Sequence, residues 1–240
     1  MNNDNDHSNQ DGKIRPAASA EIQKLSLITK VSQRALQEAH ARGLLFFTKA
    51  NRTPVYVVGD VTNTILGACR LDGKDFKGQA KGCKTMLFFD NVVPGWPVGI
   101  VEASDYPVIA LVEGVPDFLA AFQICELEGM LDRVAPVTIH STYPPIYFEA
   151  LPRFRGKRVI IFARADSDGP KAAAMWAMQL QPYAASVQVI DFSDFSQPGN
   201  KSLHEMKDAH AANYKLNPEE WRLLPAPKTA STGEEWKYAI

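Results

Sequence analysis

Residues 158–180 have the sequence RVIIFARADSDGPKAAAMWAMQL, which is the clearest indication of the fold class. It begins with an almost uninterrupted apolar run, which is typical of a strand that helices cover on both faces. A polar turn follows, and from Gly169 the pattern becomes helical, with Pro170 in the first turn. A strand, a short turn and a helix in this order predict a unit of a parallel α/β sheet.

The same alternation of apolar runs and helical patterns extends over residues 97–206. It predicts a four-stranded parallel sheet whose crossover connections are right-handed. We expect strands at residues 106–114, 135–140, 158–163 and 185–192, and helices at residues 116–130, 144–154, 169–183 and 201–214.

The residues before this region have a different pattern of apolar and polar residues. A helical pattern begins after Ser32, which suits an N-cap, and stops at Gly43. Short β-type runs separated by polar turns follow, and they predict an antiparallel meander. We expect its strands at residues 44–48, 55–59 and 65–71, before a loop rich in glycine and lysine at residues 72–84.

Four segments follow from these patterns. We expect a disordered tail at residues 1–20 and a small basic α+β subdomain at residues 21–96. The sheet domain covers residues 97–206, and a helix end with a mobile tail covers residues 207–240.

Composition narrows the class of protein. The chain has 240 residues, of which 45% are hydrophobic and 22% charged, as in soluble globular proteins. No apolar run approaches the roughly 18 residues of a membrane-spanning helix, and the N-terminus is polar, so we expect a cytoplasmic protein that does not contact a membrane. Three scattered cysteines do not suggest a zinc ribbon, and without a P-loop no helicase motor is expected.

Charge divides the chain into two parts. Residues 21–95 hold 11 Lys and Arg against 6 Asp and Glu, whereas residues 96–206 hold 8 against 13. A basic part beside an acidic part suits a protein that grips phosphates with one and holds a divalent metal with the other. Chance fluctuation explains the same charges equally well.

Acidic residues stand at the ends of the predicted parallel strands. Glu113 ends one strand, Asp166 and Asp168 follow another, and Asp191 ends a third. Because sites in parallel sheets form at the carboxyl ends of strands, we expect these carboxylates to lie close together. Crowded carboxylates repel one another unless a cation lies between them, and oxygen ligands suit Mg²⁺ or Mn²⁺. The same acids are also suited to capping the helices that follow.

Three segments carry a resemblance to a known family. ALVEGVPDFLAAF (110–122), VIIFARADSDGPKAA (159–173) and VQVIDF with KSLHEM (187–192 and 201–206) resemble the Toprim domain of topoisomerases and primases. The closest likeness is to the catalytic core of bacterial and phage DNA primases. The basic subdomain more loosely resembles the half that precedes Toprim in these cores.

The resemblance implies a Rossmann-type parallel sheet with helices on both faces. It also implies roles for single residues. Glu113 takes the catalytic position near the reacting phosphate, and Asp166 and Asp168 take the Mg²⁺-binding positions. The basic half implies phosphate binding by Arg70, Lys81 and Lys84, and we add Asp117, Asp191 and Glu205 as secondary acids.

The chain departs from the family pattern Asp-x-Asp-x-x-Gly. If the pattern is anchored on Gly169, Arg164 takes the first Asp position and Asp166 the second. If it is anchored on the acids, Asp166 and Asp168 form the pair and the glycine follows too soon. Arg164 is expected to bind a phosphate directly and to repel Mg²⁺. Further along, Ser202 and Glu205 stand where the family pattern has Asp.

These expectations converge on nucleic-acid chemistry. The first hypothesis is a primase-like protein that makes short primers on single-stranded DNA from nucleotides, with Mg²⁺ or Mn²⁺. One alternative is a catalytically weak nucleic-acid-binding accessory of a replicative helicase supplied by another chain. The other is a Toprim nuclease that acts with the same carboxylates.

Overall fold

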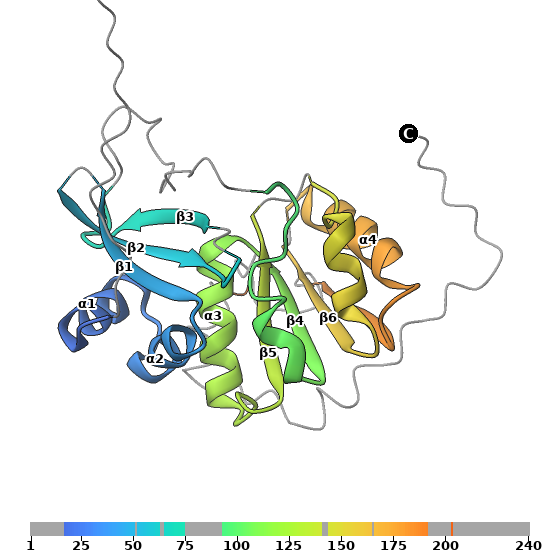
Figure 1. Cartoon of the computed structure of the whole chain (residues 1–240), viewed down its shortest axis with the longest axis horizontal. Helices are drawn as coiled ribbons and strands as arrows, with labels where there is room; N and C mark the ends of the chain where they lie inside the picture. The colour runs from blue at the N-terminus through green and yellow to red at the C-terminus, as the bar shows by residue number, and fades with distance from the viewer. Residues whose placement is uncertain are drawn as a thin grey trace, which may run out of the picture.

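The structure is a computed structural model of the 240-residue chain (Figure 1). It describes residues 17–50, 52–62, 65–74, 93–140, 144–164, 166–191 and 203. The side chains of residues 50, 65–68 and 191 lie outside this description, as does the helix predicted at residues 201–214 apart from Leu203. No helix in the described part is long and apolar enough to cross a membrane.

The larger part of the fold is the predicted four-stranded parallel sheet. Its order is β5-β4-β6-β7, and each neighbouring pair is parallel. This confirms the α/β fold class with a four-stranded parallel sheet. Its elements are η1 (Glu102–Asp105), β4 (Val108–Glu113), α3 (Gly114–Leu127), β5 (Val134–Ile139), η2 (Phe148–Phe154), β6 (Arg158–Ala163), α4 (Gly169–Leu180) and β7 (Ser186–Asp191).

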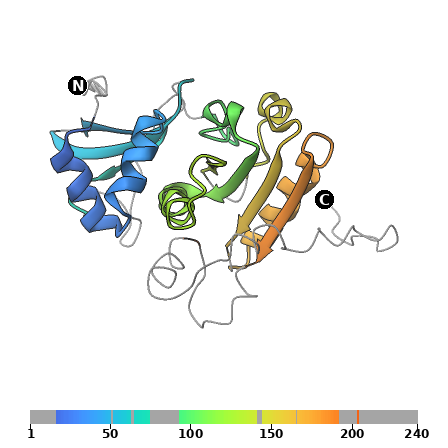
Figure 2. The same ribbon diagram turned by 90° about the horizontal axis from the view of Figure 1, so that it is seen from below.

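Helices cover both faces of this sheet (Figure 2). Alternate residues of a strand point to opposite faces. Val112 and Phe162 therefore pack with α3 in one buried cluster, and Leu111 and Ile161 pack with α4 and η2 in another. Trp176 of α4 is 2% exposed in the second cluster. This burial on two sides explains why the strands read as continuous apolar runs.

The N-terminal part has a second, antiparallel sheet of order β1-β2-β3. The meander is therefore confirmed, and α2 has Ser32 as its N-cap, with the hydroxyl accepting from the N–H of Ala35 at 3.0 Å. The elements are α1 (Ser19–Thr29), α2 (Gln33–Ala41), β1 (Leu45–Ala50), β2 (Thr53–Gly59) and β3 (Ile65–Arg70).

The first helix, α1, was not predicted from the sequence. It begins at Ser19, inside the stretch 1–20 predicted as a tail. Ile22 and Leu25, three residues apart on one face, are buried against the rest of the core. Tertiary burial of this face therefore stabilises a helix whose own sequence pattern is weak.

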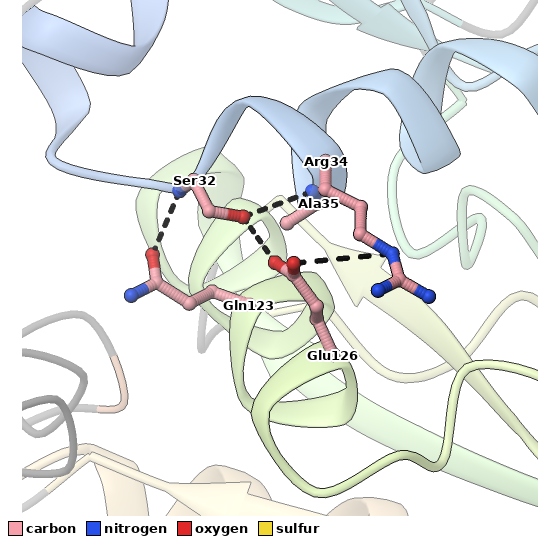
Figure 3. Close-up of polar contacts among 5 residues, drawn as sticks. All are labelled: Ser32, Arg34, Ala35, Gln123 and Glu126. Atoms are coloured by element: carbon pink, nitrogen blue, oxygen red, sulfur yellow. Dashed lines mark hydrogen bonds and ion pairs between the residues drawn. The ribbon is translucent and has the colours of Figure 1, made fainter.

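Polar contacts join α2 to α3 (Figure 3), and α3 lies between the two sheets (Figure 1). The backbone N–H of Ser32 donates to the side-chain oxygen of Gln123 at 3.1 Å. The Ser32 hydroxyl donates to Glu126, whose carboxylate also lies 4.0 Å from Arg34. Residues about 90 positions apart in the chain are thus held together, and this fixes the N-terminal part on the sheet domain.

A second polar contact joins the two parts at the end of β2. Asp60 is 4% exposed and accepts from the indole N–H of Trp96 at 2.7 Å. Next to it, Glu102 accepts from the backbone N–H of Val61 at 2.9 Å. Burial raises the pKa of Glu102, and the nearby Asp60 charge raises it further. Trp96 is therefore part of the packing between the two parts of the fold.

Candidate functional site

The carboxyl edge of the parallel sheet brings several predicted site residues together. β4 ends at Glu113, β6 at Ala163 and β7 at Asp191. Ala163 is the register partner of Asp191, and β4 and β6 pair in parallel. Neighbouring strands lie about 4.8 Å apart. Glu113, Arg164 and Asp191 therefore stand at one edge of three adjacent strands.

The β4–α3 junction is short, because the helix begins directly after the strand. Glu113 is half-buried at the N-cap position of α3, and its side chain makes no capping hydrogen bond to that helix. Gly114 follows with a φ of 76°, a conformation that favours glycine over residues with a Cβ. The backbone conformation at residue 114 thus explains why a glycine follows Glu113. Asp117, in the first turn of α3, is 4% exposed.

The β6–α4 junction is longer and contains an ion pair. Arg164 is the first residue after β6, and its Nε lies 3.2 Å from Oδ2 of Asp166. The other oxygen of Asp166 accepts from the backbone N–H groups of Asp168 at 3.2 Å and Gly169 at 2.8 Å. Asp166 therefore does what the capping alternative predicted, since it satisfies backbone donors at the start of α4.

The absence of a side chain at Gly169 allows the start of α4 to lie close to the backbone of Arg164. A Cβ at this position would lie 2.0 Å from the backbone oxygen of Arg164 and 2.7 Å from its carbonyl carbon. Only glycine fits such an approach without a backbone shift. This contact gives the register anchored on Gly169 a physical basis: the glycine packs against residue 164, which here is an arginine.

Asp168 also has a cationic neighbour. Its Oδ1 lies 3.4 Å from Nζ of Lys171. Sequence reasoning did not select Lys171 as part of the site. The spacing of three residues, which brings side chains together on a helix, is the signal that identifies it.

We tested whether the described residues fit a divalent cation. Mg²⁺ prefers several oxygen ligands without a cation beside them. At this edge Asp166 is engaged by Arg164 and two backbone donors, and Asp168 is engaged by Lys171. Within the described ranges, no group of three or more His, Cys, Asp or Glu side chains is placed to hold a metal. In this arrangement the residues do not fit the metal that the sequence resemblance implies, and the metal-binding roles of Asp166 and Asp168 stay predictions.

Of the basic residues predicted to bind phosphate in the N-terminal part, the structure describes only Arg70. Arg70 forms a two-pronged contact with Asp72, with Nε 2.9 Å from Oδ1. This contact holds the pKa of Asp72 well below its usual range. Phosphate binding by Arg70 stays a prediction, and it requires competition with Asp72. Lys81, Lys84 and Glu205 lie outside the described residues, as does the side chain of Asp191.

His140 follows β5 at the same edge and is half-buried. Burial lowers the pKa of its imidazole, which favours the neutral form at neutral pH.

Comparisons with known proteins give distant similarity to primases. No protein-family model and no curated protein matches the chain. The primase fragment of the bacteriophage T7 primase-helicase protein is 18% identical, with a TM-score of 0.41 over 84% of this chain and 73% of that one. The zinc-binding and RNA polymerase domains of the Aquifex aeolicus primase are 18% identical, with a TM-score of 0.44 over 88% of this chain and 49% of that one. The DnaG catalytic core is 16% identical, with a TM-score of 0.49 over 87% and 72%. Similarity at this level carries no functional argument.

Proposed function

We propose that the chain is a primase-like protein of the Toprim class that binds single-stranded nucleic acid. Two observations support this: the three sequence segments that resemble Toprim, and the position of Glu113 and Arg164 at the ends of adjacent strands. The second carries the proposal, because it places the residues of two of those segments at one edge of the sheet. In this proposal residues 21–96 form the basic subdomain and residues 97–206 the Toprim domain.

Phosphate recognition is the part of primase chemistry that the geometry favours most. Arg164 has a side chain that is 42% exposed, and its Nε lies 3.2 Å from Oδ2 of Asp166. A guanidinium carries further N–H donors in a planar fork that suits phosphate oxygens. We therefore propose that Arg164 contacts a phosphate of the nucleic acid and that Lys81 and Lys84 contact further phosphates of the same nucleic-acid strand.

The partner and location follow from the same proposal. We propose that the protein works with a helicase supplied by another chain, which separates the strands. We place the protein in the cytoplasm, where replication proteins of this class act.

Fluorescence anisotropy with labelled single-stranded DNA tests the binding function. We expect saturable binding whose affinity falls steeply with salt, because phosphate contacts release counterions. Lys84→Ala is expected to weaken binding for all sequences and to reduce the salt slope by about one. An affinity that does not change with salt would contradict the proposal.

Nucleotidyl transfer is the second candidate function, and Glu113 favours it. The residue is half-buried at the end of β4, where the family resemblance places the catalytic acid or base. The resemblance implies Mg²⁺ or Mn²⁺ for this reaction, and either ion would neutralise developing charge when bound. Because Arg164 and Lys171 engage Asp166 and Asp168 in this arrangement, those ion pairs would have to open before the carboxylates could hold the ion.

Incubation with labelled nucleotides and single-stranded DNA tests this second function. Short primers would support it, and DNA cleavage would indicate the nuclease alternative. We expect Glu113→Gln to lower either activity at least about 100-fold while DNA affinity is kept within about twofold. Full activity in this variant would remove Glu113 from the site.

A further inference from the structure

We infer that Arg164 is a built-in cation that replaces a divalent metal at the carboxyl edge of the sheet. The inference rests on the proposed function in one respect, which is that this edge is the functional site. It concerns how the acids at the edge are neutralised, and it predicts that the folded chain needs no metal there.

The position of Arg164 is the first support. Arg164 is the first residue after β6, which ends at Ala163, and β6 lies between β4 and β7 in the sheet. The close approach of Gly169 to the backbone of residue 164 holds this residue in place. A side chain from this position starts at the edge where β4, β6 and β7 end.

The pairing of charges is the second support. Arg164 lies 3.2 Å from Asp166, and Lys171 lies 3.4 Å from Asp168. Each acid of the β6–α4 turn thus has a cation from the chain itself. In an acid cluster of a metal site, the bound ion supplies this neutralising charge. Here the polypeptide supplies it, and a metal that approached Asp166 would meet the like charge of Arg164.

The use of the carboxylate oxygens is the third support. Oδ1 of Asp166 accepts two backbone N–H groups, and Oδ2 faces Arg164. Displacement of Arg164 by Mg²⁺ would break the ion pair and bring two positive charges together. The same turn without the arginine would offer Oδ2 to a metal, so residue 164 decides whether the edge responds to divalent cations.

Thermal unfolding of the full chain with Mg²⁺ alone tests the inference. Wild-type protein, Arg164→Asp and Arg164→Gln are compared in EDTA and in millimolar MgCl₂ at equal ionic strength. We expect the wild-type Tm to change by less than about 1 °C, whereas MgCl₂ raises the Tm of Arg164→Asp saturably by about 3 °C or more. Arg164→Gln is expected to show a smaller rise.

Arg155→Asp is the matched control, because Arg155 is exposed and precedes β6 at the opposite end of the strand. It carries the same charge change and is expected to give no Mg²⁺-dependent rise. A saturable rise in the wild-type Tm would overturn the inference, and so would a folded Arg164→Asp variant without any rise. If Arg164→Asp does not fold under either condition, Arg164→Gln decides in the same way: a rise above wild type supports the inference and its absence overturns it. No nucleic acid is present, so the outcome is independent of whether the chain binds DNA.

Discussion

Two arginines, Arg42 and Arg164, serve different purposes in this molecule. The side chain of Arg42 is 8% exposed, whereas that of Arg164 is 42% exposed. Arg42 lies between the two parts of the fold, with its guanidinium 4.4 Å from the Tyr106 ring centre and 5.2 Å from that of Phe122. It also pairs with Glu38 at 2.8 Å. Its remaining donors bind the backbone oxygens of Leu131 and Val134.

The comparison separates an arginine with a structural role from the arginine that we propose as a phosphate ligand. The Arg42 contacts are internal, so the protein uses this cation to join its N-terminal part to the sheet domain. Among the described residues Arg164 forms one ion pair, and its side chain is 42% exposed. Burial and donor use distinguish the two roles, although both residues count equally toward sequence charge. Four predictions sharpen this difference.

The largest effect is expected for Arg42→Ala. Loss of the side chain removes the Glu38 pair and the ring contacts and leaves two backbone oxygens without this donor. We expect the free energy of unfolding in urea to fall by about 2–4 kcal/mol. Arg34→Ala is the control, since Arg34 is 78% exposed and lies 4.0 Å from Glu126; it should change stability by less than about 0.5 kcal/mol. Equal losses in both variants would contradict the structural role of Arg42.

Gly169→Ala should have the next largest effect. The added methyl group would lie 2.0 Å from the backbone oxygen of Arg164, so the start of α4 must shift. We expect a loss of about 1–3 kcal/mol in urea unfolding. Gly156→Ala, where nothing lies within 4 Å and only the φ of 73° is unfavourable, should lose about 1 kcal/mol. A smaller loss at Gly169 than at Gly156 would mean that α4 does not pack against residue 164.

Arg164→Gln should change function more than stability. Its ion pair is about two-fifths exposed on both sides, so its loss should lower the free energy of unfolding by less than about 1 kcal/mol. In fluorescence anisotropy we expect single-stranded DNA affinity to fall about threefold to tenfold and the salt slope to decrease by about one. Arg155→Gln should leave both quantities unchanged. A stability loss as large as that of Arg42→Ala would place Arg164 in the structural class.

The smallest effect is expected for Glu102→Gln, at the polar contact between the end of β2 and the sheet domain. Glutamine keeps an acceptor for the Val61 N–H and removes a half-buried charge near Asp60. Because folding raises the pKa of Glu102, this group stabilises the fold below its unfolded pKa, and that contribution is lost as pH rises through the folded pKa. We therefore expect the free energy of unfolding of Glu102→Gln, relative to that of wild type, to be about 0.5 kcal/mol higher at about pH 7 than at about pH 4. Tm values at the two pH values measure this, and an equal difference at both would refute it.

Much of the fold could be predicted from local patterns. Continuous apolar runs and Pro at helix starts identified the parallel sheet, and β6 ends at Ala163 as the run predicts. α1 was missed because its burial depends on contacts with later elements, which the sequence of residues 19–29 does not reveal. The capping hydrogen bonds of α2 were predicted because Ser32 and Ala35 are local.

The site was predictable in position but not in charge pairing. The strand ends placed Glu113 and residue 164 correctly at one edge, because parallel strands share their direction. Whether Asp166 faces a metal or Arg164 depends on the shape of a turn, and the sequence left two registers open. Arg42 counted as part of a basic, phosphate-binding half, yet its partners at residues 131 and 134 are about 90 positions away. Such pairings need the folded chain.

Anisotropy of labelled single-stranded DNA in EDTA and in MgCl₂, at equal ionic strength, tests most directly whether the carboxyl edge works with an arginine in place of a metal. If Arg164 supplies the cation, the wild-type chain binds in EDTA at least as tightly as in MgCl₂, since the contact needs no metal and Mg²⁺, as a divalent counterion, competes with the protein for the DNA phosphates. An affinity that falls more than about tenfold when EDTA replaces Mg²⁺ would contradict the account, because a bound metal would then supply the contact assigned to Arg164.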